Sequence, residues 1–514
     1  MSAFKKNTAS MPLPLRVSYE HFTDGWNFDA APDSLRDTEL SEAMNCLPDE
    51  RGGISKRPGT VRLNQVSYGG PIKRVYEVGK PDSIKFINAS DNVLRNFDGT
   101  AIHTGFANVD FDVEVWGNKT YFVNGDKYYV WDYINFGEVV PAVNADLTAV
   151  KRCKYICQRG IRMFAAGDPQ NPNRVYFSEG NEPNNFKATS SVDAVTDDED
   201  VITGLFVVGT GISSALVVFK KRSIYAWSGW DPLVDVQFHK QSAGAGTVAR
   251  RTICQANNSV YYMGEHGVYR LVSPYPDQIL SECITDPTPQ RPGISNFIRN
   301  LKNKENVCAV FWRRYYMLAV QDGDTPDCNN KVLVFDTALD RWVGWFNLCV
   351  NDWCIRSDGK LVFASSLGGL LLEYGVGWND DGSPIHFKVS TKDLDLGHRY
   401  HDKKIKIFMV SGKQYVQEKS TVKITVKTDY SITKRGISFD ESNVDSKSII
   451  GGSIWGWKDT ITKIIKDLRQ RGMRTHITFE NDVLGEPVTI YGISFGFRLK
   501  RAKVPKIVGV EVLE

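Results

Sequence analysis

Short runs of aromatic and β-branched residues alternate with tight polar turns through the middle of the chain. Two such runs joined by Gly, Asp, Asn or charged residues are typical of a β-hairpin. The predicted hairpins span Ile84–Phe97, Thr120–Asp132, Arg162–Ser178, Ala215–Trp227, Val260–Leu271, Tyr315–Phe335 and Leu361–Tyr374. The step from Ile84 to Thr120 is 36 residues and that from Val260 to Tyr315 is 55. A four-stranded propeller blade takes roughly 40 to 50 residues.

A hairpin cannot bury its apolar face alone, and its edges stay open to other chains. Packing six to eight blades around an axis solves both problems. The pattern therefore predicts a mainly β protein with a β-propeller of about seven blades, with six to eight allowed, in which each hairpin is half a blade. Two stacked sandwiches of meandering strands are the alternative.

The regions on either side of the hairpins have different patterns. Residues 1–70 predict an N-terminal arm with a short helix from Ser34 to Cys46, capped by Asp33 or Ser34. We assign residues 71–384 to the propeller and residues 385–514 to a β-rich platform domain. Period-two alternation predicts strands in that domain at Lys403–Val410, Thr421–Lys427, Arg474–Glu480 and Val488–Leu499. Helical spacing of the apolar residues between 459 and 470 predicts a short helix there.

Composition narrows the function classes. The chain of 514 residues is long enough for two or more domains. Its 63 basic and 60 acidic residues give a formal charge of +3. This small net charge does not indicate a protein that binds nucleic acids or membranes through its overall charge. Nine irregularly spaced cysteines favour reduced thiols over a disulfide framework. No signal peptide is expected, and Val201–Phe219, uncharged but broken by glycines, predicts two buried strands rather than a membrane span.

Candidate chemistry is sparse. The Asp box, the Gly-x-Ser-x-Gly elbow, phosphate-binding loops and His-Glu-x-x-His are missing from the sequence, and Ser357-Asp358-Gly359 is interpreted as a turn. Four groups of residues are candidates for binding. Cys153 with Cys157 could be a zinc pair and His398 with His401 a second metal pair. The run Asp197–Asp200 could bind a cation, and Trp342, Trp345, Trp353 and Trp378 could form a platform for sugars. The structural interpretation is favoured for each, as thiols, turns, a solvated loop and packing aromatics. No catalytic, cofactor-binding or metal residue and no cofactor are predicted.

Three groups of residues carry a resemblance to a known family. They are Asp29–Leu35 with Glu42–Asn45 and Gly53–Gly59; Arg174–Ser178, Glu182-Pro183-x-x-Phe186, Leu216–Lys220 and Ser223–Tyr225; and Ile477–Phe479 with Gly485–Ile493. Together they resemble the tail nozzle proteins of short-tailed bacteriophages, also called tail tube or stabilisation proteins. The resemblance spans nearly the whole chain, but its motifs are short and structural.

The resemblance implies a virion protein of the phage tail, assembled in the host cytoplasm. It implies a ring, commonly of six copies, around the DNA exit channel, in contact with adaptor or portal-side proteins and fibre proteins, with no stable membrane insertion. The resemblance also implies that DNA passes through the lumen without specific binding. The near-neutral charge of the chain is compatible with this, because clusters of Lys and Arg would bind the phosphates and retain the DNA. The alternatives are a glycan-binding propeller that uses exposed aromatics such as Trp230 and Trp378, and a propeller hydrolase with scattered Asp residues.

Overall fold

The computed structural model describes residues 14–80, 83–194, 199–209, 214–229, 232, 234, 236–243, 245–272, 281–323, 328–415, 418–439, 460–466, 468 and 470–500. The chain divides into two compact units. The sandwich unit comprises Met1–Trp26, Ala30–Arg57 and Pro384–Glu514, and the propeller unit comprises Asn27–Asp29 and Pro58–Ser383. The residues expected to form a separate N-terminal arm, 1–70, are thus divided between both units.

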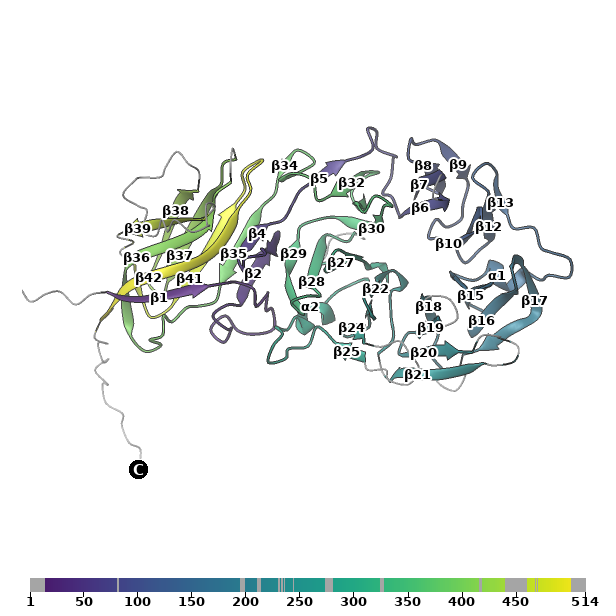
Figure 1. Ribbon diagram of the computed structural model, residues 1–514, viewed down its shortest axis with the longest axis horizontal. Coiled ribbons are helices and arrows are strands. Elements are labelled where there is room, and N and C mark those ends of the chain that lie inside the picture. Colours follow the sequence, from purple (N-terminus) through teal and green to yellow (C-terminus); the bar gives the residue numbers. More distant parts are fainter. Residues whose placement is uncertain are drawn as a thin grey trace, which may run out of the picture. The chain divides into compact units, whose positions relative to one another are not determined.

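The propeller unit contains six continuous four-stranded antiparallel meanders, which are propeller blades (Figure 1). The first three are β6 Arg74–Lys80, β7 Ser83–Ser90, β8 Val93–Asn96 and β9 Ala101–Thr104; β10 Asp112–Trp116, β11 Lys119–Val123, β12 Tyr128–Trp131 and β13 Phe136–Glu138; and β14 Tyr155–Arg159, β15 Arg162–Asp168, β16 Asn171–Glu179 and β17 Glu182–Asp193. The next three are β18 Ile202–Val208, β19 Ala215–Lys220, β20 Ser223–Ser228 and β21 Gln237–Ala243; β22 Cys254–Ala256, β23 Ser259–Met263, β24 Val268–Leu271 and β25 Ser281–Cys283; and β26 Cys308–Trp312, β27 Tyr315–Val320, β28 Lys331–Asp336 and β29 Arg341–Phe346.

A seventh sheet is assembled from two distant parts of the chain. Its first three strands are β30 Val350–Ile355, β31 Leu361–Ser365 and β32 Leu371–Tyr374, and its fourth is β5 Thr60–Arg62, which pairs antiparallel with β32. The short strands β33 Asn379–Asp380 and β34 Ser383–Pro384 follow β5 in the strand order. A cluster that joins Ile72 and Val75 to Cys354, Ala364 and Leu371 packs this sheet against the first blade, so the sheets surround a common centre.

All seven predicted hairpins are present, as the second and third strands of the seven sheets. Their local turns explain why they could be predicted. Asp91 and Asn92 both have positive φ, 47° and 60°, as a tight primed turn requires. The prediction of a propeller with six to eight blades is therefore confirmed, and the uncharged stretch Val201–Phe219 forms β18 and most of β19. Within the described residues, no helix is long and apolar enough to cross a membrane.

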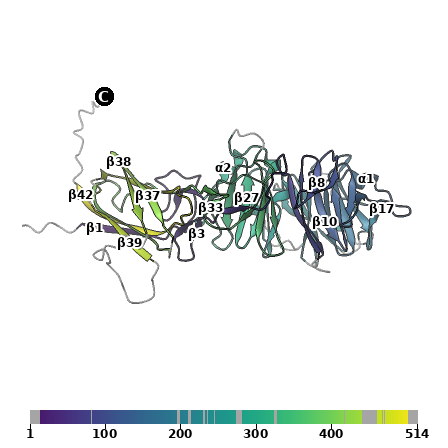
Figure 2. The same ribbon diagram turned by 90° about the horizontal axis from the view of Figure 1, so that it is seen from above.

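The sandwich unit is built from both ends of the chain. One of its sheets contains β1 Leu15–Glu20, β3 Cys46–Pro48, β4 Ile54–Lys56, β36 Asp402–Lys413, β39 Thr460–Lys466, β40 Arg471–Gly472 and β42 Thr489–Lys500. The other has the order β2 Leu40–Met44, β35 Phe387–Thr391, β41 Thr475–Asn481, β37 Thr421–Thr428 and β38 Ser431–Ser438. Figure 2 shows the two as separate layers. Every second residue along β37 and β41 is buried and the residues between them are partly buried or exposed, which places one face of that sheet in the core.

The helix predicted from Ser34 to Cys46 is wrong, because Leu40–Met44 forms β2. β2 pairs with β35, and the register shifts between Leu40 and Glu42. This bulge displaces the strand alternation by one residue. Leu40 and Ala43 therefore share one face of the strand, and both are buried, as is the adjacent Met44. The spacing of these three residues by three and four positions imitates an amphipathic helix.

The helix predicted between 459 and 470 is also wrong. Thr460–Lys466 forms β39, in which Ile464 and Ile465 pair with Met409 and Phe408 of β36. The described helices are the short turns α1 Thr148–Lys151 and α2 Ser295–Arg299, together with 3₁₀ turns at Arg250–Thr252 and Lys304–Asn306. The spacing of these isoleucines fits a helix, but β-branched residues also favour strands, and pairing with β36 makes this segment a strand.

Gly59 provides a test of how the seventh sheet is completed. A Cβ atom at Gly59 would lie 2.0 Å from the backbone oxygen of Asn379. We expect Gly59→Ala to lower the free energy of unfolding by about 2 kcal/mol, because backbone must move to relieve the overlap. Urea unfolding would measure it. Gly137→Ala is the control, since nothing lies within 4 Å of its Cβ; equal effects of the two substitutions would contradict the close approach.

Candidate functional site

The centre of the propeller is lined by the first strand of each sheet, from β6 to β30 (Figure 1). Neighbouring first strands belong to different sheets, so they share no backbone ladder. Backbone groups between them therefore need other partners if they are buried. Polar side chains of the first strands supply these partners. We call them the axial groups, and they are Asp112, Glu114, Asn351, Asp352, Tyr76 and Arg159.

Two carboxylates join the second blade to the third. Asp112 Oδ2 accepts a hydrogen bond of 3.0 Å from the backbone N–H of Ile156, and Glu114 Oε2 accepts one of 3.3 Å from that of Gln158. Both acceptors are on β10 and both donors are on β14. Arg250 Nε lies 3.7 Å from Asp112 Oδ2, which adds an ion pair from the segment before β22. The carboxylates thus serve as links between blades.

The same arrangement joins the seventh sheet to the first blade. Asp352 Oδ2 accepts a 3.1 Å hydrogen bond from the backbone N–H of Val75. Beside it, the Asn351 side-chain amide donates to the backbone oxygen of Ile72 at 3.0 Å. These two bonds cross the point at which the last sheet meets the first, so they stabilise the closed arrangement.

Two longer side chains complete the pattern. The Tyr76 hydroxyl, on the first blade, donates to the backbone oxygen of Phe111 at 2.6 Å. Arg159 Nε and Nη2, on the third, donate to the backbone oxygen of Ser214 at 3.1 and 2.8 Å. Each of these hydrogen bonds joins one blade to the next along the chain, so the axial groups hold neighbouring blades together.

Burial perturbs the acid–base properties of these groups. Burial raises the pKa of Glu114 to about 7, assisted by Asp112 and opposed by the hydrogen bond from Gln158. Burial also raises the pKa of Asp352, against the attraction of Arg74 and Arg251, and lowers the pKa of Arg74. A carboxyl group that titrates near neutral pH has the property of a general acid or base. In this structure, however, the Glu114 carboxyl group accepts a hydrogen bond from the backbone N–H of Gln158 in the neighbouring blade.

The axial region also contains two thiols, Cys254 and Cys308. Burial raises the pKa of both to about 12, so the thiols are protonated at neutral pH and are not activated nucleophiles. All nine cysteines of the chain are free. In the described part of the chain, no three His, Cys, Asp or Glu side chains are grouped as a metal site would require.

The structure separates the two cysteines of the candidate zinc pair. Cys153 follows α1 and is buried in the core between the second and third blades, whereas Cys157 lies on β14 and packs in the core between the third and fourth. His398 and His401 do meet, with ring centroids 6.0 Å apart. Both lie in a turn whose carbonyl groups accept hydrogen bonds from Lys403 Nζ at 2.6 and 3.0 Å.

The acidic run and the tryptophans also have structural roles where they are described. Asp197 and Asp198 lie outside the described residues, while Asp200 is buried and accepts a 2.8 Å hydrogen bond from the backbone N–H of Arg222 in the β19–β20 turn. Trp342 is fully buried, and its Nε1 donates to the backbone oxygen of Ile284 at 2.9 Å.

The remaining tryptophans differ in exposure. Trp353 is buried against Phe363. Trp345 is half-buried with the ammonium of Lys331 4.0 Å from its ring centroid, and Trp378 is half-buried. The preference for packing over sugar binding is therefore supported for Trp342 and Trp353.

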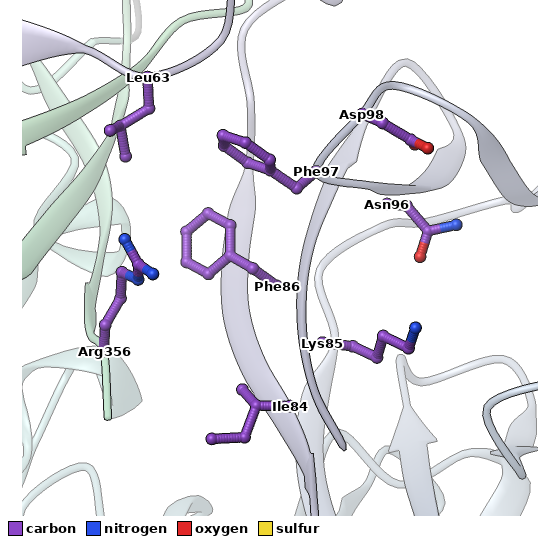
Figure 3. A pocket seen from close by; sticks show the side chains of 8 residues that line it. All are labelled: Leu63, Ile84, Lys85, Phe86, Asn96, Phe97, Asp98 and Arg356. Atoms are coloured by element: carbon purple, nitrogen blue, oxygen red, sulfur yellow. The ribbon is translucent and has the colours of Figure 1, made fainter. Parts of the chain in front are cut away.

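A cavity of about 450 Å³ opens beside β7 and β8 of the first blade. In Figure 3 the rings of Phe86 and Phe97, the side chain of Leu63 and the guanidinium of Arg356 face one another, whereas Lys85 and other polar side chains point away. The two phenylalanine rings meet edge to face at 5.8 Å. Four apolar and four polar residues line the cavity, and the polar ones include the cations Lys85 and Arg356 and the carboxylate of Asp98.

The axial groups were not identified from the sequence. One signal was present: Asp112, Glu114 and Asp352 lie on the weaker strand that precedes a strong hairpin. Charged residues in an otherwise apolar first strand indicate positions that face the propeller axis. Their partners are backbone groups, which carry no sequence signature, so the links themselves could not be predicted.

The strand order and the axial groups define this chain as a β-propeller protein with an additional β-sandwich. No protein-family model matches it, and no curated protein matches it. Among solved structures it is similar to streptogramin B lyase (10% identity, TM-score 0.38, covering 62% of this chain and 98% of that one). It is also similar to PorZ, a surface component of the type-IX secretion system of Porphyromonas gingivalis (8%, 0.42, 80% and 59%). A third is an exo-β-1,3-galactanase from Phanerochaete chrysosporium (8%, 0.26, 66% and 94%). Such weak likeness carries no argument about activity, substrate or partners.

Proposed function

We propose that this protein is a non-enzymatic structural subunit of a bacteriophage tail nozzle, in which several copies form a ring around the channel that DNA crosses during ejection. The observation that carries the proposal is the use of the axial groups. Asp112, Glu114 and Asp352 occupy the position where a propeller enzyme would keep catalytic groups, yet each accepts a backbone hydrogen bond from the next blade. These hydrogen bonds hold neighbouring blades together, which suits a protein that forms part of the wall of a channel.

The family resemblance supports the same function. Its central motifs coincide with blade strands, since Arg174–Ser178 lies in β16, Leu216–Lys220 is within β19 and Ser223–Tyr225 begins β20. Its closing motif begins in β41 and ends in β42. The near-neutral charge of the chain is compatible with a conduit, because a wall rich in phosphate contacts would slow the passage of DNA. Adaptor or portal-side proteins and fibre proteins are the proposed neighbours in the tail.

The glycan-binding alternative has less support. A sugar platform requires exposed aromatic rings, whereas Trp342 and Trp353 are buried in the propeller. Trp230 lies outside the described residues, and Trp378 is partly covered rather than fully exposed.

Electron microscopy tests the proposed function. We expect the purified full chain, or virions that contain it, to show ring-shaped assemblies, commonly of six copies, with the protein at the tail. A chain that stays monomeric at all concentrations and is missing from phage tails would contradict the proposal. Turnover of a polysaccharide that is lost in a single carboxylate variant would instead favour a propeller hydrolase.

A further inference from the structure

The cavity of about 450 Å³ beside the first blade lies where that blade meets the seventh sheet. The first blade contributes Ile84 and Phe86 on β7 and Phe97 after β8, and the seventh sheet contributes Leu63 after β5 and Arg356 after β30 (Figure 3). Both sheets belong to the propeller unit, so the cavity lies within one compact unit. Its volume is in the range of about 300 to 1,000 Å³ that is typical of sites for small ligands.

The apolar side chains of the cavity are partly open to solvent and are held in place. Ile84 is 39% exposed and Phe97 is 42% exposed. The Tyr68 hydroxyl donates a hydrogen bond to the backbone oxygen of Phe97. Phe86 meets the Phe97 ring edge to face and packs with Leu63 against the buried cluster between the two sheets. The aromatic wall is thus positioned before a ligand arrives, which lowers the entropic cost of binding.

Three of the four polar side chains that line the cavity point away from its interior, namely Lys85, Asn96 and Asp98 (Figure 3). The Asp98 carboxylate accepts hydrogen bonds from the backbone N–H and the hydroxyl of Thr100 at 2.9 and 2.6 Å. Asn96 Nδ2 donates to the same hydroxyl at 3.0 Å. Asp98 and Asn96 are therefore engaged in the turn between β8 and β9, and the negative charge of Asp98 does not face the apolar walls.

Arg356 is the lining cation that faces the interior (Figure 3). Its guanidinium lies 3.7 Å from the carboxylate of Asp358, which is beyond hydrogen-bond distance, and its side chain is 36% exposed. In the part of the chain that the structure describes, this guanidinium makes no hydrogen bond. A guanidinium can bind a carboxylate through two parallel N–H donors. The cavity therefore combines aromatic walls with a cation that a carboxylate can reach.

We propose that this cavity binds an aromatic carboxylate, with the ring against Phe86 and Phe97 and the carboxylate paired with Arg356. Contact between aromatic rings adds to the gain from burying their surface. A neutral sugar fits the cavity less well, because it requires several hydrogen-bonding side chains, whereas Arg356 is the one polar lining side chain that points inward. The inference goes beyond the proposed function, since it requires neither a second copy of the chain nor DNA.

Two sources can present this chemistry. One is a free small aromatic acid. The other is a segment of a partner protein in which an aromatic residue follows an acidic one, and aromatic side chains commonly anchor such contacts. Both place a ring a few bonds from a carboxylate, so they make the same contacts in the cavity.

Ligand-observed NMR titration of the purified full chain tests the role of Arg356. We expect N-acetyl-L-phenylalanine to bind about tenfold more tightly than N-acetyl-L-phenylalaninamide, because hydrogen bonds between charged groups are the stronger ones. Arg356→Gln should remove this preference and leave binding of the neutral amide unchanged. Lys85→Gln is the matched control, since Lys85 lines the same cavity but points away, and it should keep the preference. Equal binding of the two probes, or a preference lost in Lys85→Gln and kept in Arg356→Gln, would overturn the proposal.

A second substitution tests the aromatic wall. We expect Phe97→Ala to weaken both probes about fivefold through loss of ring contacts. Val140→Ala is the control, because Val140 is an exposed apolar residue that does not line the cavity, and it should change neither affinity. Urea unfolding verifies that each variant is folded. Unchanged binding to a folded Phe97→Ala protein would overturn the proposal.

A blocked dipeptide distinguishes the two sources. Acetyl-Asp-Phe-amide carries its carboxylate beside the ring within a peptide, and acetyl-Asn-Phe-amide is its neutral counterpart. Tighter binding of the Asp dipeptide than of N-acetyl-L-phenylalanine would assign the site to a partner segment, and the reverse order would assign it to a free aromatic acid. Either order supports the proposal, whereas no binding of any probe at millimolar concentration would overturn it. These titrations need no ring assembly, so that negative result would leave the proposed function standing.

Discussion

Replacing Asp168 by Asn is expected to lower the free energy of unfolding by about 3 kcal/mol. Asp168 is fully buried in the β15–β16 hairpin. Arg152 Nε and Nη2 donate to its two oxygens at 2.8 and 2.9 Å, the Tyr176 hydroxyl donates at 2.8 Å, and Gln170 N–H and Asn171 Nδ2 donate at 3.1 and 3.2 Å. The Asn side chain would place an amide donor against the guanidinium and leave buried donors without an acceptor.

The pKa of Asp168 gives this prediction a pH dependence. Burial acts to raise its pKa, but the hydrogen bonds from Arg152, Asn171, Gln170 and Tyr176 outweigh burial and hold the pKa well below the ordinary 3.8. Because the folded pKa is depressed, the stabilisation is present above pH 3.8 and is lost as the pH falls through the folded value. We therefore expect the deficit of Asp168→Asn to be full at neutral pH and to shrink in strong acid.

Asp193→Asn is the matched control for Asp168→Asn. Asp193 also binds an arginine through two bonds, from Arg174 Nε and Nη2 at 2.7 and 3.0 Å, and it lies in the same blade. Its side chain, however, is 41% exposed, and exposed ion pairs contribute about 0 to 1 kcal/mol. Urea unfolding at pH 7 should separate the two variants clearly. Equal losses would mean that burial of the Asp168 network is not what stabilises the hairpin.

Local signals explain which parts of the fold could be predicted. The seven hairpins were predicted because each depends on its own strands and turn, as at Asp91 and Asn92. The seventh sheet could not be completed in this way, since β5 at Thr60–Arg62 pairs with β32 near Tyr374, and no local pattern records a pairing over that sequence distance. The two wrong helices failed for a related reason: partner strands, β35 for Leu40–Met44 and β36 for Thr460–Lys466, overrode the spacing of apolar residues.

The axial groups show the same limit at the candidate site. Catalytic motifs are patterns of side chains, whereas Asp112 and Asp352 accept hydrogen bonds from backbone N–H groups of another blade. The charge of these residues is visible in the sequence, but their backbone partners are not. The hydrogen bonds that these carboxylates accept from neighbouring blades favour the proposed structural role.

Glu114 gives the second large effect, with the opposite pH dependence to Asp168. Its pKa is raised by burial to about 7 from the ordinary 4.5. Between these values the folded protein binds more protons at this site than the unfolded chain does, so stability from Glu114 is full below pH 4.5 and is lost as the pH rises through 7. A shift of this size corresponds to roughly 3 kcal/mol. Glu114→Gln stays neutral and retains an oxygen to accept the Gln158 N–H, so it should be more stable than the parent at pH 8 by about 2 kcal/mol.

The measurement for Glu114→Gln is urea unfolding at half-unit steps from pH 5 to 8, with the variant giving a flatter profile than the parent. The matched control is Glu138→Gln in the same blade, whose exposed carboxylate binds Lys127 and Lys151 and has a lowered pKa. That variant should gain no stability at pH 8, because its charge is solvated and paired. A Glu114→Gln protein less stable than the parent at pH 8 would show that the ionised carboxylate is needed at the axis. In that case Glu114 would have to be reconsidered as a group retained for chemistry rather than for linking blades.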